Sequence, residues 1–256
     1  MLRAMLKSVV VHDIPMSQVA AMERWYWRDH APEISRRFGP WLARLDSYLP
    51  VDAPAEARIH GYFNWRVTEG YWREMPQPGP RGNLAFTVPP VWPRVATAFF
   101  AAQPTDDFCG GGLQPAERPV LRWYCLSRYP DGVGERNGES WFLDVHAKEL
   151  AAAGGPYRSF STKAHKERLP LPGEWPPGKT PPRDSVLHGW DRLTELWFET
   201  FDDWRIFNQE VAPSFTRPPW ATAPHYPFVR TGREFVSSFL LERPTDEFVR
   251  DGRGYL

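Results

Sequence analysis

The sequence has no long apolar run. No stretch of about 18 consecutive apolar residues occurs in the chain, which excludes a conventional transmembrane helix. The apolar run from residue 8 to 11 near the N-terminus is too short for the apolar core of a secretory signal peptide. We therefore expect a cytoplasmic protein that has no membrane partner.

Cysteine and excess charge are scarce as well. Cys109 and Cys125 are the only cysteines, and their spacing matches neither a metal site nor a disulfide framework. We expect both to be free thiols in a reducing compartment. The 31 basic residues balance the 31 acidic residues, so the net charge is zero and a nucleic-acid partner is not expected.

Several sequence motifs of catalysis and binding are missing. The chain has no GxGxxG and no GK[ST], which argues against a phosphate-binding loop, and no GxSxG, which argues against a serine hydrolase. No two histidines have the HxH or HxxxH spacing of a local metal site, so we predict neither a metal nor a cofactor. Four histidines near carboxylates leave a transition metal as a minor alternative.

Tryptophan and proline are abundant, with 13 and 28 residues. So many aromatic side chains indicate wide apolar surfaces, either in a core or in a pocket for a flat apolar ligand. An aromatic core with proline-rich surface loops accounts for most of them.

One helical motif occurs twice. Residues 25–34 (WYWRDHAPEI) and 141–150 (WFLDVHAKEL) share a Trp, a Tyr or Phe, a His-Ala pair, a Glu and an aliphatic residue. On an α-helix the aromatic lies at i−4 from the His, the Glu at i+3 and the aliphatic residue at i+4, so all four share one face. Pro32 is expected to kink the first copy or to end its first part just after His30.

Two further matches occur in the same order in both halves. His60-Gly61 with residues 66–69 resembles His188-Gly189 with residues 192–195, and the segment 99–108 resembles 239–248. Matches in register favour a duplication. We predict a first unit at residues 1–108, a linker at 109–119 and a second unit at 120–256.

Each unit is predicted to have the order strand, helix, strand, strand, helix, strand. The expected strands are 6–12, 42–49, 62–68, 95–100, 121–129, 157–165, 193–199 and 235–241, with a loop at 54–58. The expected helices are 18–38, 139–153 and 201–211, the last capped by Asp202, and one in the helix-poor stretch 81–92. This order is typical of the split βαβ, ferredoxin-like unit. The fold class is therefore α+β: two ferredoxin-like units whose sheets close on each other into a barrel, as in a dimer.

The first helical motif carries a family resemblance. The run from Trp27 to Pro32 resembles the helix motif of the EthD-like family, which belongs to the dimeric α+β barrel superfamily, and residues 195–199 resemble its third strand. The second copy lacks the Arg and the Pro, so the two units need not carry equivalent sites. The resemblance implies an acid/base pocket between sheet and helix. The superfamily includes cofactor-free monooxygenases, lactone isomerases, polyketide cyclases and dehydratases.

Histidines are the first candidates for catalysis, because imidazole titrates near neutral pH. His30 and His146 lie in the repeated motif, where Glu33 and Glu149 are placed one turn on to orient them or to raise their pKa. His60 and His188 each precede a glycine in a turn. The competing interpretation is that each imidazole fills a polar edge of a packed interface or faces water.

Nine further residues are candidates for substrate binding. Arg28 is suited to a substrate carboxylate or phenolate, and the aromatic side chains are suited to stacking on a ring, although packing explains them equally well. The set is Trp25, Tyr26, Trp27, Arg28, Asp29, Tyr62, Trp141, Phe142 and Trp190.

The leading hypothesis is a cofactor-independent lyase, dehydratase, isomerase or cyclase that acts on a small apolar, aromatic or polycyclic substrate. His30 or His146 would remove a proton, and His60 or His188 would stabilise or reprotonate the product. One alternative is a cofactor-free monooxygenase on a phenolic substrate. Another is a non-catalytic small-molecule-binding protein. The tandem arrangement is compatible with a monomeric barrel and with a homodimer.

Overall fold

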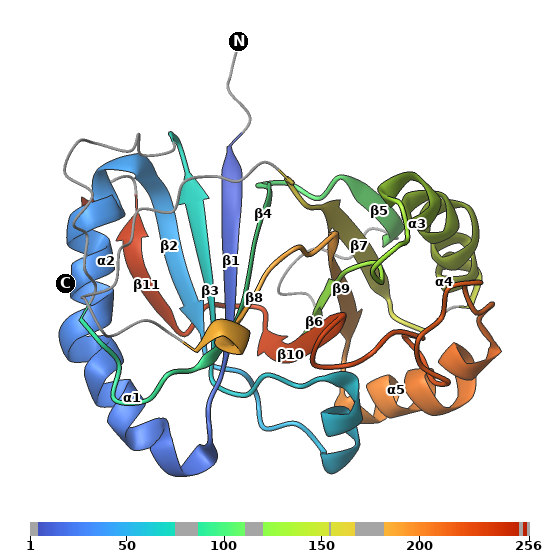
Figure 1. The fold of residues 1–256 in the computed structure, drawn as a ribbon, viewed down its shortest axis with the longest axis horizontal. Helices are drawn as coiled ribbons and strands as arrows, with labels where there is room; N and C mark the ends of the chain where they lie inside the picture. Colours follow the sequence, from blue (N-terminus) through green and yellow to red (C-terminus); the bar gives the residue numbers. More distant parts are fainter. Residues whose placement is uncertain are drawn as a thin grey trace.

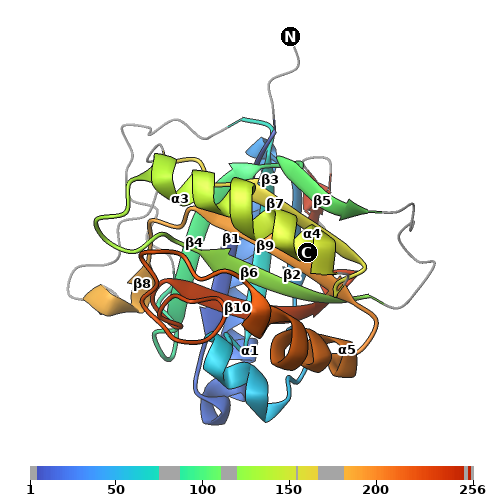
Figure 2. The ribbon, with the colours of Figure 1, turned by 90° about the vertical axis from the view of Figure 1, so that its right-hand side faces the viewer.

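A computed structural model of the chain describes residues 5–74, 87–110, 120–153, 155–166, 182–250 and 253–254. Two β-sheets face each other in the middle of the molecule, and helices cover their outer faces (Figure 1). Turning the molecule by a quarter turn brings α3, α4 and α5 in front of the sheet that they cover (Figure 2). The architecture is thus four layers, helix, sheet, sheet, helix.

The first unit supplies four antiparallel strands. These are β1 (Leu6–Asp13), β2 (Leu42–Tyr48), β3 (Arg66–Trp72) and β4 (Arg94–Ala101), in the order β2-β3-β1-β4. The β-branched run of β1 lies in the centre, as its apolar sequence predicts.

The second unit repeats this order. Strands β6 (Leu121–Ser127), β7 (Arg158–Lys163), β9 (Arg192–Phe198) and β10 (Phe235–Leu241) are arranged as β10-β6-β9-β7. Both sheets have the ferredoxin-like order, and bridges from Tyr62 to Ser237 and from Phe100 to Ala164 join them. The fold is therefore α+β, with two ferredoxin-like units that form a barrel of the dimeric α+β type, as predicted.

The segment after the last strand of each unit crosses to the sheet of the other. β5 (Asp106–Gly110) pairs with β7, and β11 (Asp246–Arg250) pairs with β2. Figure 1 shows β11 beside β2 in one half of the molecule and β5 beside β7 in the other. The sequence suggested only a tail motif here, because these short polar segments lack the pattern of a buried strand.

The helix of each repeated motif contains a wide π-helical turn. The segments are α1 (Val19–Trp25), the turn Tyr26–His30 and α2 (Ala31–Phe38), and then α3 (Glu135–Trp141), the turn Phe142–His146 and α4 (Ala147–Ala153). The predicted boundary just after His30 is where the π-helical turn ends and α2 begins. The second copy has Lys148 at the position of Pro32 and the same turn, so the proline is not needed for the turn. Pro32 instead lies in the first turn of α2, where its missing N–H is tolerated.

Other expectations also need correction. The third strand begins at Arg66, not at residue 62, because Gly61 has a φ of 62° and the chain still turns there. Residues 55–60, predicted as part of a loop, form a 3₁₀-helix. The cap of α5 (Phe201–Ile206) is Thr200, whose hydroxyl accepts from the Asp203 N–H in a capping box, and not Asp202. Residues 87–92 are not helical, and the rest of the helix expected at 81–92 lies outside the described residues.

The remaining short elements connect these. They are β8 (Val186–Leu187), β12 (Arg253–Gly254), the π-helical turn Phe207–Val211 and the 3₁₀-helices Met16–Gln18, Gly39–Trp41, Ala55–His60, Arg183–Ser185 and Ala212–Ser214.

A buried arginine ties the layers of the first unit together. Arg66 on β3, only 1% exposed, forms two hydrogen bonds to Glu23 of α1, at 3.0 and 2.6 Å. It also donates to Asp246 of the exchanged strand β11 at 2.8 Å and to Ser47 at 2.9 Å. Its guanidinium lies over the Tyr26 ring at 4.1 Å.

The second unit repeats this network. Arg192 on β9 donates to Glu139 of α3 at 2.9 and 2.8 Å, to Asp106 of β5 at 2.9 Å and to Ser161 at 3.1 Å. Its guanidinium lies over the Phe142 ring at 4.2 Å. Helix, sheet and exchanged strand therefore meet at one buried charge in each unit.

We expect Arg192→Met to lower the free energy of unfolding by about 3–5 kcal/mol, because it leaves the carboxylates of Glu139 and Asp106 without their buried partner. The measurement is urea denaturation of the full chain. Lys148→Met, which removes an exposed ion pair with Asp144 at 3.8 Å, is the matched control and should change stability little. Equal unfolding midpoints for the two variants would contradict the role of the network.

Candidate functional site

A small cavity lies between the second sheet and the helix α3–α4. Its volume is about 50 Å³, enough for a water molecule but not for a ring. We call it the inner cavity. Its walls come from β6, β9, the helix and the loop before β10. The residues that line it are Cys125, Ser127, Arg128, Tyr129, Trp141, Phe142, His146, Thr194, Leu196, Trp220, Tyr226, Pro227, Val229 and Phe235.

The π-helical turn places His146 in this cavity. A π-helical turn brings residues five apart above one another, and the rings of Trp141 and His146 are stacked at 5.3 Å with an interplanar angle of 6°. The expected α-helical spacing at i−4 gives only a tilted contact with Phe142 at 5.5 Å. The wider turn thus fixes the imidazole against a tryptophan face.

His146 is buried among aromatic rings. Its Nε2 lies 3.5 Å from the hydroxyl of Tyr226, and the rings of Phe215 and Tyr226 are 5.6 and 5.7 Å away. Burial lowers the pKa of His146 to about 4, although the nearby carboxylate of Glu149 acts to raise it. The expectation that the glutamate would raise this pKa is therefore wrong in its net effect, and the imidazole is neutral at neutral pH.

Glu149 instead fixes the loop that carries Tyr226. Its carboxylate accepts hydrogen bonds from the backbone N–H and the hydroxyl of Thr216. Further along, Glu234 accepts from the Thr222 hydroxyl and from Arg230. These contacts anchor the loop on both sides of Tyr226 and so position its phenol next to His146.

The strands show why the inner cavity forms in the second unit. His12 of β1 lies opposite Arg66, and Ser127 of β6 lies opposite Arg192, so Ser127 is the counterpart of His12. Trp65 and Asp191 directly precede the two arginines, so Asp191 is the counterpart of Trp65. In the first unit Trp65 is 2% exposed and packs against His12 and Tyr26. Two bulky rings therefore occupy space that smaller side chains leave open in the second unit.

His30 lies in this filled counterpart. It stacks on Trp25 at 4.6 Å, and burial together with His12 lowers its pKa to about 3. Glu33, one turn on, pairs with Arg37 at 2.6 Å and accepts from the Thr87 N–H. His30 lines neither of the two cavities described here.

A larger outer cavity lies on the other side of Tyr226. Its volume is about 390 Å³, and it is bounded by residues 56–60, by α5 with the turn after it, and by the loop 213–228. His60 and Tyr226 line it, so Tyr226 separates the two cavities. His60 packs edge-on against Trp123 and Trp204 of the second unit, and burial lowers its pKa to about 4.

The other predicted site residues are scattered. His188 is exposed and lines neither cavity. Trp190 is 2% exposed, lies between the sheets and donates to the carbonyl of Leu187. Tyr62 donates to the carbonyl of Val51 at 2.8 Å. Of the candidate residues, the inner cavity brings together only Trp141, Phe142 and His146.

Three more candidates lie on the outer side of the first helix. Trp27 is 42% exposed and packs against Phe248. Arg28 forms a salt bridge with the neighbouring Asp29 at 2.9 Å, so a surface carboxylate already balances its charge.

Sequence reasoning missed Tyr226, Trp220 and the strand residues of the cavity. The only signal for the first two was the aromatic, proline-rich character of residues 213–227. Cys125 lines the inner cavity. Burial raises the pKa of its thiol and keeps it protonated, so it is not a reactive nucleophile.

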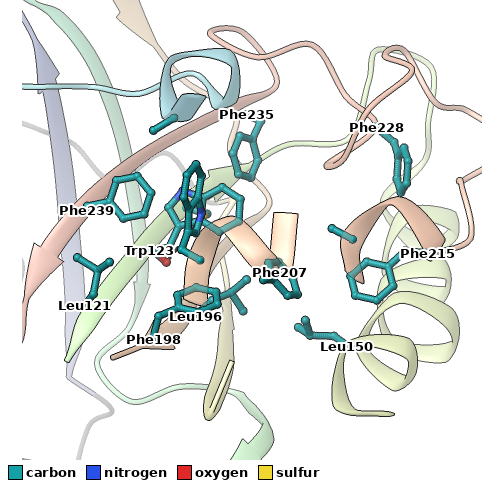
Figure 3. Close-up of a cluster of buried hydrophobic side chains, with 14 of the residues drawn as sticks. Leu121, Trp123, Leu150, Leu196, Phe198, Phe207, Phe215, Phe228, Phe235 and Phe239 are labelled. Carbon is teal, nitrogen blue, oxygen red and sulfur yellow. Dashed lines mark hydrogen bonds between the residues drawn. The ribbon is translucent and has the colours of Figure 1, made fainter. Parts of the chain in front are cut away.

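The apolar wall of the site continues into a buried cluster. Figure 3 shows Trp123 beside Phe235 and Phe239, with Phe207 and Phe215 on the helical side. Trp123 and Phe239 are stacked with an interplanar angle of 9°. This packing makes the wall behind His146 apolar.

In the part of the chain that the structure describes, no three His, Cys, Asp or Glu residues are grouped so as to hold a metal ion. Across the same residues, no helix is long and apolar enough to cross a membrane.

Comparisons with known proteins agree on the fold. The model of the chalcone isomerase N-terminal domain family matches residues 3–88, less than half of the chain and within the first unit. The structure of an anthrone oxidase-like protein is similar at a TM-score of 0.51 and 12% identity, over 99% of this chain and 95% of that one. A chlorite dismutase from Candidatus Nitrospira defluvii gives a TM-score of 0.42 at 8% identity, over 93% and 90%. No curated protein matches in sequence.

The similarity to the anthrone oxidase-like structure supports the α+β barrel fold. The matched family is not the EthD-like family that the helix motif resembles.

Burial of neutral His146 should make folding sensitive to acid. Between its ordinary pKa of 6.5 and the lowered value of about 4, the unfolded chain binds a proton that the folded chain does not. The free energy of unfolding should therefore fall as the pH drops through this interval. In His146→Gln the slope should be shallower by up to about 1.4 kcal/mol per pH unit.

The measurement is urea denaturation at a series of pH values from 7 to 4. His165→Gln, a change at an exposed histidine of the same unit, serves as the control. An unchanged slope in His146→Gln would mean that His146 has the same pKa in the folded and the unfolded chain, and would contradict the lowered value.

Proposed function

We propose that the chain is an enzyme in which His146 acts as a general base and Tyr226 as its partner acid. The substrate is a small hydroxylated aromatic molecule with an acidic C–H next to a ketone. One observation carries the proposal: a neutral, buried imidazole nitrogen lies 3.5 Å from a phenolic hydroxyl in an aromatic cavity.

The two groups can move one proton without a cofactor. His146 Nε2 takes the proton from the substrate carbon, and the electron pair of that bond shifts to the ketone oxygen. The hydroxyl of Tyr226 donates a hydrogen bond to this oxygen and stabilises the enolate. Return of the proton from the imidazolium to another carbon gives an isomer, and protonation of a leaving hydroxyl gives a dehydration.

The low pKa of His146 restricts the substrate. An imidazolium with a pKa of about 4 is a strong acid for a protein group, so it returns the proton readily. The same value makes His146 a weak base, which requires a C–H bond activated by a ketone and an aromatic ring.

Substrate entry requires a side chain to move. An apolar cavity that takes up benzene has a volume of about 150 Å³, whereas the inner cavity has about 50 Å³. Rotation of Tyr226 toward the outer cavity would join the two spaces. The ring of the substrate would then lie beside Trp141 and Trp220, whose rings pack edge to face at 5.2 Å.

Membership in the EthD-like family is part of the same proposal, supported by the motif from Trp27 to Pro32. A cofactor-free monooxygenase is the second candidate, because deprotonation of an electron-rich aromatic is also its first step. A non-catalytic binding protein is the third. The two enzymes differ in the step after proton removal, and the binding protein removes no proton, so an experiment can separate all three.

The test is solvent exchange. We expect the chain to catalyse deuterium incorporation from D₂O into anthrone at the ring methylene opposite its ketone, or into a dihydrochalcone at the carbon beside the ketone, monitored by NMR. His146→Gln should abolish exchange, and Tyr226→Phe should reduce it about 10²-fold or more, since general acid–base groups contribute in this range. His165→Gln should exchange at the rate of the unchanged protein.

The outcomes separate the candidates. Oxygen uptake that accompanies exchange would favour the monooxygenase. Binding without exchange would favour the binding protein. Loss of exchange in His30→Gln but not in His146→Gln would place the site in the first unit and overturn the assignment.

A further inference from the structure

The outer cavity has the features of a ligand site in its own right. Its volume of about 390 Å³ falls within the range of small-molecule pockets, about 300–1,000 Å³. It is formed by the 3₁₀-helix Ala55–His60 of the first unit and by α5 and the loop 213–228 of the second. It therefore lies where the two units meet.

Aromatic rings form part of its walls. Trp204, Tyr226 and Phe228 line the cavity, and Trp204 and Phe228 are 1% and 2% exposed. These rings contact others of the second unit's core, including Phe239 and Phe207. A flat apolar body is the shape that such walls accept with the largest buried area.

Three buried polar atoms at this cavity have no hydrogen-bond partner among the described residues. They are His60 Nδ1, Trp204 Nε1 and Asn208 Oδ1. His60 is 6% exposed and Trp204 is 1% exposed. Buried polar groups are nearly always paired, because an unpaired one costs free energy. These three atoms have almost no accessible surface, so they lie within the wall of the cavity and not on its face.

The charge at the cavity is uneven. Arg205 is paired with Asp202 and lies 3.5 Å from Glu56. Arg217 has no acidic partner among the described residues; it donates to the carbonyl of Ala223 at 3.2 Å, and its guanidinium lies 5.9 Å from the Phe228 ring. The guanidinium of Arg217, next to an aromatic wall, is therefore available to bind an anion.

We propose that the outer cavity binds a planar aromatic carboxylate. The ring lies against Trp204, Tyr226 and Phe228, and the carboxylate pairs with Arg217. This site is separate from the inner cavity and does not depend on the chemistry proposed for His146.

The experiment is calorimetric titration of the full chain with 2-naphthoate and with the neutral 2-naphthamide. We expect the acid to bind more tightly than the amide. Arg217→Met should weaken binding of the acid about tenfold, equivalent to about 1.4 kcal/mol, and leave the amide unaffected. Arg233→Met removes an exposed arginine that lines neither cavity and should change neither affinity.

A third variant locates the ligand. Ser127→His places a ring in the inner cavity, as in the first unit, and should leave naphthoate binding unchanged. Loss of binding in this variant would place the acid in the inner cavity and overturn the proposal. Equal affinities for acid and amide, or equal effects of Arg217→Met and Arg233→Met, would also overturn it. Naphthoate binding that persists in His146→Gln separates this site from the proposed reaction.

Discussion

A buried guanidinium needs a negative charge nearby and hydrogen-bond acceptors for its N–H groups. In each half of this chain, these acceptors come from both halves. Arg66 finds Glu23 in its own unit and Asp246 in the exchanged strand of the other. Arg192 finds Glu139 and Asp106 in the same way. Because removal of one partner leaves a buried charge uncompensated, neither sheet has a complete core without the other. The helix, the sheet and the crossing strand are therefore held in fixed positions, and the π-helical turn beside each arginine is held with them.

The two units differ in the side chains that surround the stacked Trp–His pair. The first keeps the stacked Trp25–His30 pair but places Trp65 and His12 next to it. The second keeps Trp141–His146 and has small or acidic side chains at those positions, which leaves the inner cavity. The first unit in turn contributes His60 to the wall of the outer cavity in the second. The two units thus share one scaffold, and the inner cavity lies in the second of them.

Most of the strands and the barrel could be predicted, because β-branched runs and their order depend on local sequence, whereas the duplication stays a prediction. The π-helical turn was not predicted, since the aromatic at i−4 from the His also fits an α-helix, although the Trp that both copies carry five residues before the His was a usable signal. The repeated Glu-x-Trp of Glu23 and Glu139 was a usable signal for the ion network, yet its partners Asp246 and Asp106 lie in segments with no strand pattern. Tyr226 comes from a proline-rich loop without periodicity, so only its tertiary contacts show its place beside His146. Pairing a motif histidine with a loop histidine was reasonable, but the group found beside His146 is a phenol.

The exchanged strands also protect the molecule from self-association. A sheet edge with open N–H and C=O groups pairs readily with a second chain, and β2 and β7 would be such edges if β11 and β5 did not cover them. Detachment of the segment that ends in β11 would uncover the edge of β2 and separate Arg66 from Asp246 in the same event. The edge of β2 therefore becomes available to a second chain only when the ion pair between Arg66 and Asp246 is broken as well. The charge of Asp246 thus helps to keep this edge covered.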